Sequence, residues 1–171
     1  MNTKLQRILV PGTFDPITKG HLDIITRACA LSPEVIVGVA ESRSKRGGPC
    51  FSLQERLEFA KEACAELKQV KVMSFNCLLV DFAQEIGAQA VVKGLRALTD
   101  FEYEFQQAAI NYHLDRELET LFIMSNPNYS YLSSSLIKEL AQFGGDIEQL
   151  VTPGVFNALK KKFNAASGQN S

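Results

Sequence analysis

The chain has 171 residues, a length typical of one domain, since domains usually hold about 100–200 residues. Hydrophobic residues make up 46% of the chain and charged residues 22%, as in globular proteins that bury a core of their own. The formal net charge of −1 argues against a general nucleic-acid binder, because such proteins carry a basic excess that displaces counterions.

Short β-rich runs alternate with helical patterns along most of the chain. The expected strands are residues 8–10, 35–40, 70–75, 90–92 and 121–124. The expected helices are residues 21–30, 53–67, 78–86, 101–114 and 134–143, and a last helix that opens at Pro153 and reaches Lys162. This alternation predicts an α/β fold with a mostly parallel sheet and right-handed crossovers. We expect one domain over residues 1–165 and a flexible C-terminal tail over 166–171.

The loop after the first strand is the first candidate site, because parallel sheets bind ligands outside the carboxyl ends of their strands. Residues 11–21 read Pro-Gly-Thr-Phe-Asp-Pro-Ile-Thr-Lys-Gly-His. The glycines let the backbone approach a phosphate, and the helix that begins near His21 points free amides toward it. His21 adds a side-chain donor at the same place. The alternative interpretation is an ordinary loop with a threonine N-cap and a packed histidine.

Cations mark the end of the fourth strand. Lys93 and Arg96 flank Gly94, and both can hold phosphate oxygens, Arg96 in bidentate fashion. Glu104, in the next helix, is a candidate to pair with one of these cations or to bind a nucleotide. The alternative interpretation is two solvated cations and a surface carboxylate.

Two further loops belong to the same rim of the predicted sheet. Three consecutive serines, at positions 133–135, precede the helix after the fifth strand and can offer hydroxyls and amides to an anion. Arg43, Lys45 and Arg46 follow the second strand. A simple helix cap and a solvated basic loop are the alternatives for these two segments.

Several kinds of site are excluded by the absence of their motifs. The chain has no G-x-x-x-x-G-K-[ST] P-loop, no G-x-G-x-x-G after the first strand and no G-x-S-x-G elbow. The four cysteines include no C-x-x-C pair, and two histidines complete no zinc pattern. We find no signal peptide and no apolar run near the roughly 18 residues of a membrane span, so we expect a cytoplasmic protein with reduced thiols.

Three blocks of this sequence together resemble the bacterial phosphopantetheine adenylyltransferases. They are residues 11–21, with Thr-Lys-Gly-His as the (H/T)xGH element of a nucleotidyltransferase superfamily, Gly-Leu-Arg-Ala through Phe-Glu-Tyr-Glu at 94–104, and Tyr-Ser-Tyr-Leu-Ser-Ser-Ser at 129–135. The blocks occur in the order and at the spacing of that family, and the resemblance covers about residues 7–162. It implies a single doubly wound, Rossmann-like nucleotidyltransferase domain with a five-stranded parallel sheet and a C-terminal helix.

The resemblance also implies an activity. Members of the family transfer AMP from ATP to 4′-phosphopantetheine, which gives dephospho-coenzyme A and pyrophosphate in the penultimate step of coenzyme A synthesis. They use Mg²⁺ with ATP, assemble as homohexamers (dimers of trimers) and are inhibited by coenzyme A. No nucleic-acid or membrane partner is implied.

Site residues carry over position by position. His21 is expected to stabilise the transition state. The expected ATP-binding residues are Thr13, Phe14 (through its backbone amide), His21, Gly94, Leu95, Arg96, Glu104, Tyr129, Ser130, Tyr131, Leu132, Ser133, Ser134 and Ser135. The expected phosphopantetheine-binding residues are Thr13, Lys45, Leu79 and Lys93, with lysine at position 93 where the family often has arginine. No side chain is expected to hold metal, since Mg²⁺ would travel on the ATP phosphates.

The mechanism implied by the resemblance requires no nucleophilic side chain, because the substrate phosphate is already anionic at neutral pH. It requires in-line positioning and stabilisation of charge on the α-phosphate. Two alternatives stay open at this point. One is a nucleotidyltransferase that acts on nicotinate mononucleotide or glycerol 3-phosphate, and the other is a non-catalytic nucleotide-binding module on the same fold.

Overall fold

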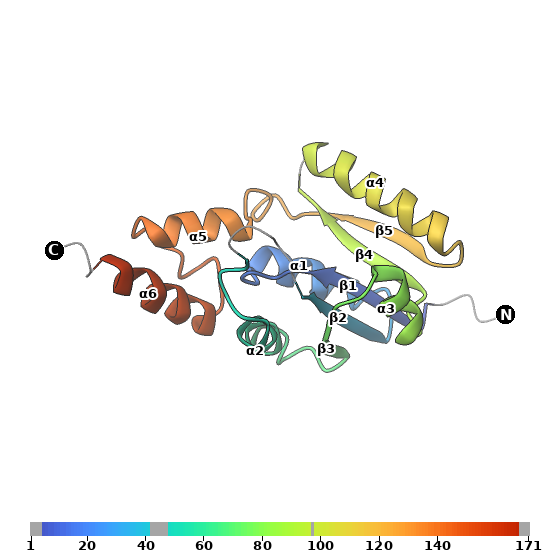
Figure 1. Ribbon diagram of the computed structural model, residues 1–171, viewed down its shortest axis with the longest axis horizontal. Helices are drawn as coiled ribbons and strands as arrows, with labels where there is room; N and C mark the ends of the chain where they lie inside the picture. The colour runs from blue at the N-terminus through green and yellow to red at the C-terminus, as the bar shows by residue number, and fades with distance from the viewer. Residues whose placement is uncertain (1–4, 42–47, 97, 168–171) are drawn as a thin grey trace.

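A computed structural model describes residues 5–41, 48–96 and 98–167 (Figure 1). Five parallel strands form its sheet: β1 (Arg7–Gly12), β2 (Glu34–Ala40), β3 (Val70–Phe75), β4 (Ala90–Leu95) and β5 (Glu119–Met124). Their order across the sheet is β3-β2-β1-β4-β5, so the strand order reverses between β1 and β4. The predicted doubly wound α/β fold is confirmed.

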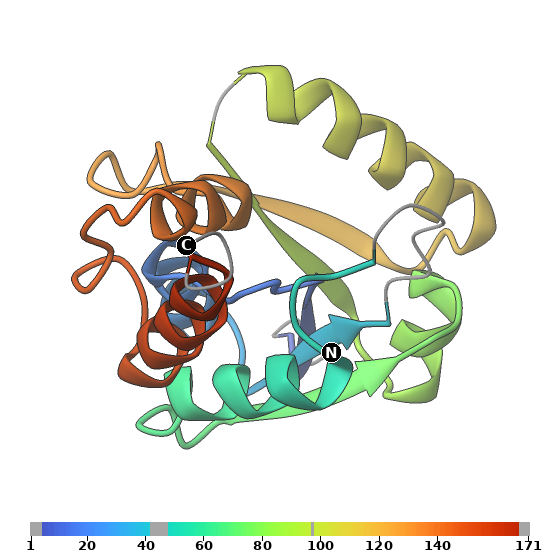
Figure 2. The same ribbon diagram turned by 60° about the vertical axis from the view of Figure 1, so that its left-hand side comes forward.

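In the described part of the chain, six helices connect and flank the strands. They are α1 (Lys19–Ala28), α2 (Leu53–Ala63), α3 (Leu79–Glu85), α4 (Leu98–Leu114), α5 (Ser134–Gln142) and α6 (Pro153–Ser167). In both views, α5 and α6 lie side by side at one end of the molecule and α4 runs along the other (Figures 1 and 2). None of the helices in the described part of the chain combines the length and apolar character of a membrane-spanning segment.

The fourth strand is longer than its sequence pattern predicted. β4 extends to Leu95 rather than ending at residue 92, because Lys93 and Gly94 continue the ladder against Phe122 and Ile123 of β5. A lysine and a glycine lack the β-branched character that marks strands in sequence, so the pattern ended too early. Lys93 therefore projects from within a strand and is not part of the loop after it.

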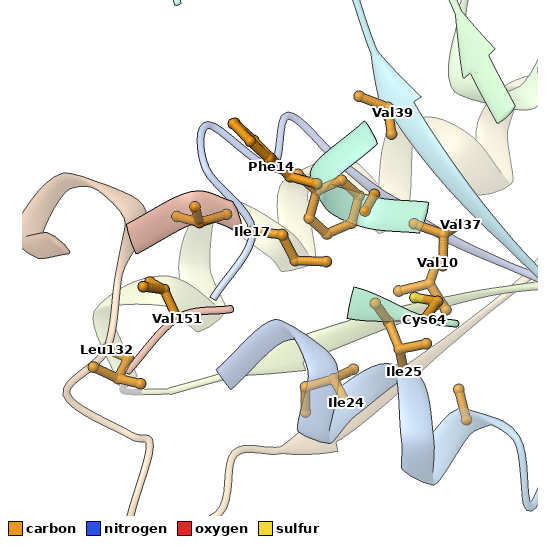
Figure 3. Packing of buried hydrophobic residues seen from close by; sticks show 14 of the residues in the cluster. Val10, Phe14, Ile17, Ile24, Ile25, Val37, Val39, Cys64, Leu132 and Val151 are labelled. Atoms are coloured by element: carbon orange, nitrogen blue, oxygen red, sulfur yellow. The ribbon is translucent and has the colours of Figure 1, made fainter. Parts of the chain in front are cut away.

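The sheet buries both faces, and alternate residues of each central strand enter different cores. Ile8 and Val10 of β1 belong to a large core shared with α1, α2, α5 and α6. Leu9 belongs to a smaller core with Ile36 and the apolar side of α3. Figure 3 shows the large core reaching Phe14 in the loop after β1. The floor of the candidate site is therefore continuous with the hydrophobic core.

The seam between β1 and β4 is short. Its ladder consists of Ile8↔Ala90 and Leu9↔Val91, whereas β1 and β2 pair over six residues. Beyond Leu9 and Val91, the two strands continue to their carboxyl ends without pairing to each other. This unpaired stretch lies at the point where strand order reverses, where ligands bind in folds of this kind.

Candidate active site

A cavity of about 600 Å³ opens at the carboxyl ends of β1 and β4. Most of the residues predicted for the site line it. These are Thr13, Phe14, His21, Lys93, Gly94, Arg96, Glu104, Tyr129, Leu132, Ser133, Ser134 and Ser135. The fold thus brings together side chains from the loop after β1, the end of β4, α4 and the segment that leads into α5.

His21 is held by the first turn of α1. Thr18 is the N-cap: the His21 amide donates to its Oγ1 (3.4 Å), and the Thr18 amide donates to Nδ1 of the imidazole (3.1 Å). Because Nδ1 accepts this hydrogen bond, the proton of the neutral ring lies on Nε2. The alternative of a threonine N-cap is therefore correct for Thr18, and this cap is what fixes the tautomer and orientation of His21.

The environment of His21 keeps the ring neutral. Burial and the positive charge of Arg96 lower the pKa of His21 from 6.5 to about 4. The ring of Phe14 packs against the imidazole edge-on, with centroids 5.2 Å apart. His21 is thus a hydrogen-bond donor through Nε2 at neutral pH, and not a cation.

The loop after β1 has a fixed shape. Phe14 is buried and adopts a left-handed backbone conformation with φ of 49°, which is uncommon for a bulky residue. The carboxylate of Asp15 accepts hydrogen bonds from the amides of Cys50 and Phe51, both at 2.9 Å, and pairs with Lys138 at 2.7 Å. Burial opposes ionisation of Asp15, but the Lys138 and backbone hydrogen bonds outweigh it and lower the carboxyl pKa.

The cations of the site are engaged with neighbouring groups. Lys93 Nζ lies 2.9 Å from Glu104 Oε2, and both side chains are about four-fifths buried, with 20% and 21% exposed. Arg96 Nη1 donates to the Leu132 carbonyl at 2.9 Å, which ties the end of β4 to the segment before α5. These contacts join β4 to both flanking walls of the cavity.

The start of α5 forms the opposite wall. Ser133 is its N-cap and accepts the Leu136 amide at 3.0 Å, while Ser134 Oγ donates to the Pro16 carbonyl at 2.8 Å. Since the first turn of α1 also lines the cavity, two helix N-termini open on the same space. The aligned peptide dipoles of such ends are favourable for phosphates.

Comparison with known proteins identifies the family. A cytidylyltransferase-like family model matches residues 9–140. The chain is 50% identical over 157 residues to a phosphopantetheine adenylyltransferase of Caulobacter vibrioides (strain NA1000 / CB15N), covering 90% of this chain and 95% of that one. One from Thiobacillus denitrificans is 51% identical over 152 residues, covering 89% and 94%. The chain belongs to the phosphopantetheine adenylyltransferase family.

Solved structures share the fold at much lower identity. A bifunctional NMN adenylyltransferase/ADP ribose pyrophosphatase from Francisella tularensis matches 94% of this chain and 50% of its own length, with TM-score 0.64 and 18% identity. A lipopolysaccharide core biosynthesis protein from Thermoplasma volcanium matches 71% of this chain and 98% of its own, with TM-score 0.55 and 20% identity. At these identities the likeness shows the fold alone.

Some residues expected from the family pattern lie away from the cavity. Leu79 opens α3 and packs against the smaller core, and the side chain of Leu95 is buried. Ser130 and Tyr131 are exposed and do not contribute to the cavity lining. Lys45 lies outside the described residues. The family pattern thus includes positions that serve the backbone or the core as well as positions whose side chains face the cavity.

Two residues that hold the site were not among the candidates. Asp15 stands within the first motif, but its neighbours Cys50 and Phe51 are 35 residues or more away in sequence, so the contact is not visible there. Arg56 is almost fully buried and bonds the Thr13 carbonyl. The sequence could have revealed Arg56 by its position, which is three residues after Leu53 and four before Ala60. This spacing puts Arg56 on the apolar face of α2, where a charge is unexpected.

The described residues that line the cavity do not form a set of metal ligands of their own. Glu104 is the one carboxylate in the described lining, and it is paired with Lys93. Over residues 5–41, 48–96 and 98–167, no three Asp, Glu, His or Cys side chains gather into a group that could hold a metal ion. Mg²⁺ prefers several oxygen ligands and keeps water readily, so these side chains alone do not fit a resident magnesium site.

Proposed function

We propose that the protein transfers the adenylyl group of ATP to the phosphate of 4′-phosphopantetheine, giving dephospho-coenzyme A and pyrophosphate. The observation that carries the proposal is the cavity itself, where a neutral His21 at the start of α1 lies among Thr13, Lys93 and Arg96. The chain is 50% and 51% identical, over 90% and 89% of its length, to two proteins named for this activity. This likeness supports 4′-phosphopantetheine as the acceptor.

The transfer is an in-line displacement at the α-phosphorus of ATP. An oxygen of the phosphopantetheine phosphate forms the new bond to that phosphorus, and the bond to the oxygen bridging to the β-phosphate breaks, so pyrophosphate leaves with its electron pair. The attacking phosphate is already anionic, so no side chain has to remove a proton. Catalysis then depends on alignment and on stabilising charge at the α-phosphate.

His21 supplies part of that stabilisation as a neutral donor. Its Nε2–H and the positive end of the α1 dipole are suited to the α-phosphate oxygens, where negative charge increases during transfer. A pKa of about 4 keeps the ring from gaining a proton near neutral pH, so the donor stays the same through the reaction.

The remaining groups divide between the two substrates. Lys93 is assigned to the phosphopantetheine side and exchanges its partner Glu104 for a phosphate when substrate binds. Arg96, the Thr13–Phe14 backbone and the first turn of α5 are assigned to ATP, whose phosphates match the two helix ends. We assign Lys45 and Leu79 to the phosphopantetheine side from the family pattern alone.

Magnesium enters with the nucleotide in this scheme. ATP phosphates and water supply its ligands, since the described cavity lining offers one carboxylate already paired with Lys93. The side chains of the cavity would bind and orient the ATP–Mg²⁺ complex, in which the ion would supply screening of the polyphosphate charge.

We also propose an assembly, a mode of regulation and a location for the protein, each from a separate argument. We propose a homohexamer built as a dimer of trimers, supported by the aromatic and aliphatic side chains that α4 leaves exposed. Coenzyme A contains the whole dephospho-coenzyme A product, so it can occupy both substrate sites as a feedback inhibitor. Four free cysteines are in keeping with a cytoplasmic location.

A substrate panel tests the activity. Pyrophosphate release from ATP and Mg²⁺ is measured with 4′-phosphopantetheine, nicotinate mononucleotide or glycerol 3-phosphate offered separately. We expect release with phosphopantetheine only, and dephospho-coenzyme A as the product. Release with another acceptor would support adenylyl transfer but contradict 4′-phosphopantetheine as the substrate. ATP binding without pyrophosphate release for any acceptor would favour a non-catalytic nucleotide-binding module.

A further inference from the structure

Arg56 of α2 is a buried guanidinium that bonds three separate backbone segments. Only 2% of the residue is exposed. Its Nη1 donates to the carbonyls of Thr13 (2.7 Å) and Ala40 (2.8 Å), and its Nε donates to the carbonyl of Phe51 (3.2 Å). It thereby joins the loop after β1, the end of β2 and the segment before α2.

The bond to Thr13 has a consequence for the next residue. The Thr13 carbonyl and the Phe14 amide belong to one planar peptide unit, and in a trans peptide the C=O and N–H point in opposite directions. Holding the carbonyl toward Arg56 therefore directs the Phe14 N–H to the other side of that plane. Thr13 and Phe14 both line the cavity.

The neighbouring contacts of this loop involve side chains and not the peptide plane between Thr13 and Phe14. Asp15 fixes the following residue to the Cys50 and Phe51 amides, and the Phe14 ring is buried beside His21. Both contacts act on side chains, whereas the Arg56 bond acts on the Thr13–Phe14 peptide itself. Phe14 also has φ of 49°, a region that bulky residues occupy only when surrounding contacts enforce it.

Burying a guanidinium is costly, which argues for a specific role. Taking such a charge out of water is unfavourable unless its donors are satisfied, and an apolar residue on the same helix face would avoid the penalty. Burial lowers the pKa of Arg56, while the nearby Asp15 and Glu41 carboxylates raise it in part. A fixed fork of donors is what only arginine provides at one position.

We infer that Arg56 is a positioning residue for the reaction: it orients the Thr13–Phe14 peptide so that the Phe14 amide is preset to donate to a phosphate oxygen of ATP. This inference rests on the proposed function for the identity of the phosphate. Arg56 does not line the cavity and does not touch substrate, so it acts through the peptide unit that it holds.

Three variants test the role. Arg56→Met retains the length of the side chain and removes all its donors, and Arg56→Lys retains the charge but loses the fork. Ala60→Gly, one turn further along α2, weakens the same helix without removing a guanidinium bond and is the stability control. Steady-state kcat and KM for both substrates are measured below the melting temperature of each variant.

We expect kcat to fall by about 10²-fold in Arg56→Met, the scale of a small misalignment at a reacting centre. KM for ATP should rise by at most about tenfold, the scale of one misplaced hydrogen bond. The kcat of Arg56→Lys should lie between those of Arg56→Met and the wild type. Ala60→Gly should keep kcat within about twofold of the wild type, although its melting temperature is lower. Wild-type kcat in Arg56→Met or Arg56→Lys, or an equal loss in Ala60→Gly, would overturn the inference.

Hydrogen exchange measured by mass spectrometry gives a readout that needs no turnover. We expect faster exchange over residues 11–17 in the Arg56 variants and unchanged exchange there in Ala60→Gly. Unaltered exchange in this segment in the Arg56 variants would overturn the inference even if the wild type is active. A wild type that forms no dephospho-coenzyme A would instead overturn the proposed function. Faster exchange over residues 11–17 in the Arg56 variants alone would still support the conclusion that Arg56 orders this loop.

Discussion

His21 has two properties that the proposed reaction requires, a hydrogen-bond donor at Nε2 and a neutral ring. In the proposed reaction its ring donates a hydrogen bond through Nε2, and the Thr18 amide leaves the proton on that nitrogen by donating to Nδ1. The ring must also stay neutral, and burial together with Arg96 ensures this by lowering its pKa. A cationic histidine would attract phosphates more strongly in the ground state as well, which does not by itself raise kcat.

Removal of this donor should slow transfer without abolishing the fold. In His21→Ala we expect kcat to fall by about 10²–10³-fold, the usual effect of losing one preorganised donor to a developing anion. Pyrophosphate release under saturating substrates measures it. His113→Ala is the matched control, since His113 lies exposed in the last turn of α4. Near-normal turnover of His21→Ala would refute the role.

The same residue should make stability depend on pH. The unfolded imidazole has a pKa near 6.5 and the folded one about 4, so the unfolded chain binds more protons between these values. The contribution is complete above pH 6.5 and is lost as pH falls toward 4. We expect the wild type to lose about 1–2 kcal/mol more than His21→Gln between pH 7.5 and 5. Urea denaturation at both pH values measures it; equal losses would contradict the assignment.

Lys93 should act on one substrate more than on the other. We expect Lys93→Ala to weaken phosphopantetheine binding by about tenfold or more, because a charge-assisted contact to phosphate is lost, with ATP binding less affected. Calorimetric titration of each ligand measures the two effects. Lys71→Ala, which also breaks a lysine–glutamate pair but on β3, should alter neither. Unchanged phosphopantetheine affinity in Lys93→Ala would remove this residue from the site.

At the scale of elements, two capping boxes start two helices with different consequences. Ser52 and Glu55 cap α2 in the pattern that the sequence predicts. Thr18 and His21 cap α1 in the same geometry, but histidine is not the residue that the usual pattern contains at this position. The sequence therefore predicted a helix that begins near His21, and the structure shows that it begins at Lys19 with His21 as part of its cap.

A pair of cap variants separates stability from activity. Thr18→Ala and Ser52→Ala should each lower the free energy of unfolding by about 1 kcal/mol. Thr18→Ala should also lower kcat, because the hydroxyl that helps to hold the His21 ring is lost, whereas Ser52→Ala should leave kcat unchanged. Denaturation and pyrophosphate release measure the two quantities. Equal kcat in both variants would show that the α1 cap has no part in catalysis.

At the scale of the molecule, α4 exposes an apolar surface. Phe105 and Tyr112 are seven residues apart, on one face of the helix, with 57% and 54% of their surface exposed. Phe105→Glu with Tyr112→Glu should dissociate the proposed hexamer, because charge is strongly disfavoured in the centre of an interface. Sedimentation velocity measures the mass. Phe143→Glu, at an exposed position at the C-terminal end of α5, is the control; a monomeric wild type would contradict the proposal.

Local patterns predicted the number, kind and approximate bounds of the elements, and the parallel direction of the strands. They contained no direct information on the order β3-β2-β1-β4-β5, since that depends on which crossovers cover which face. The same limit applies to the site. The motifs led to Thr13, His21 and Arg96, which line the cavity. Arg56 and Asp15 act through contacts between segments far apart in the chain, and local patterns do not show such contacts, although the charge of Arg56 on an apolar helix face was a signal that the residue is unusual.

The short seam between β1 and β4 divides the residues of the cavity between two halves of the sheet. Two residue pairs join one half of the sheet, which carries Thr13 and His21, to the other half, which carries Lys93 and Arg96. A ligand bound between these side chains contacts both halves of the sheet, so its binding adds a bridge across the stretch where the two strands do not pair.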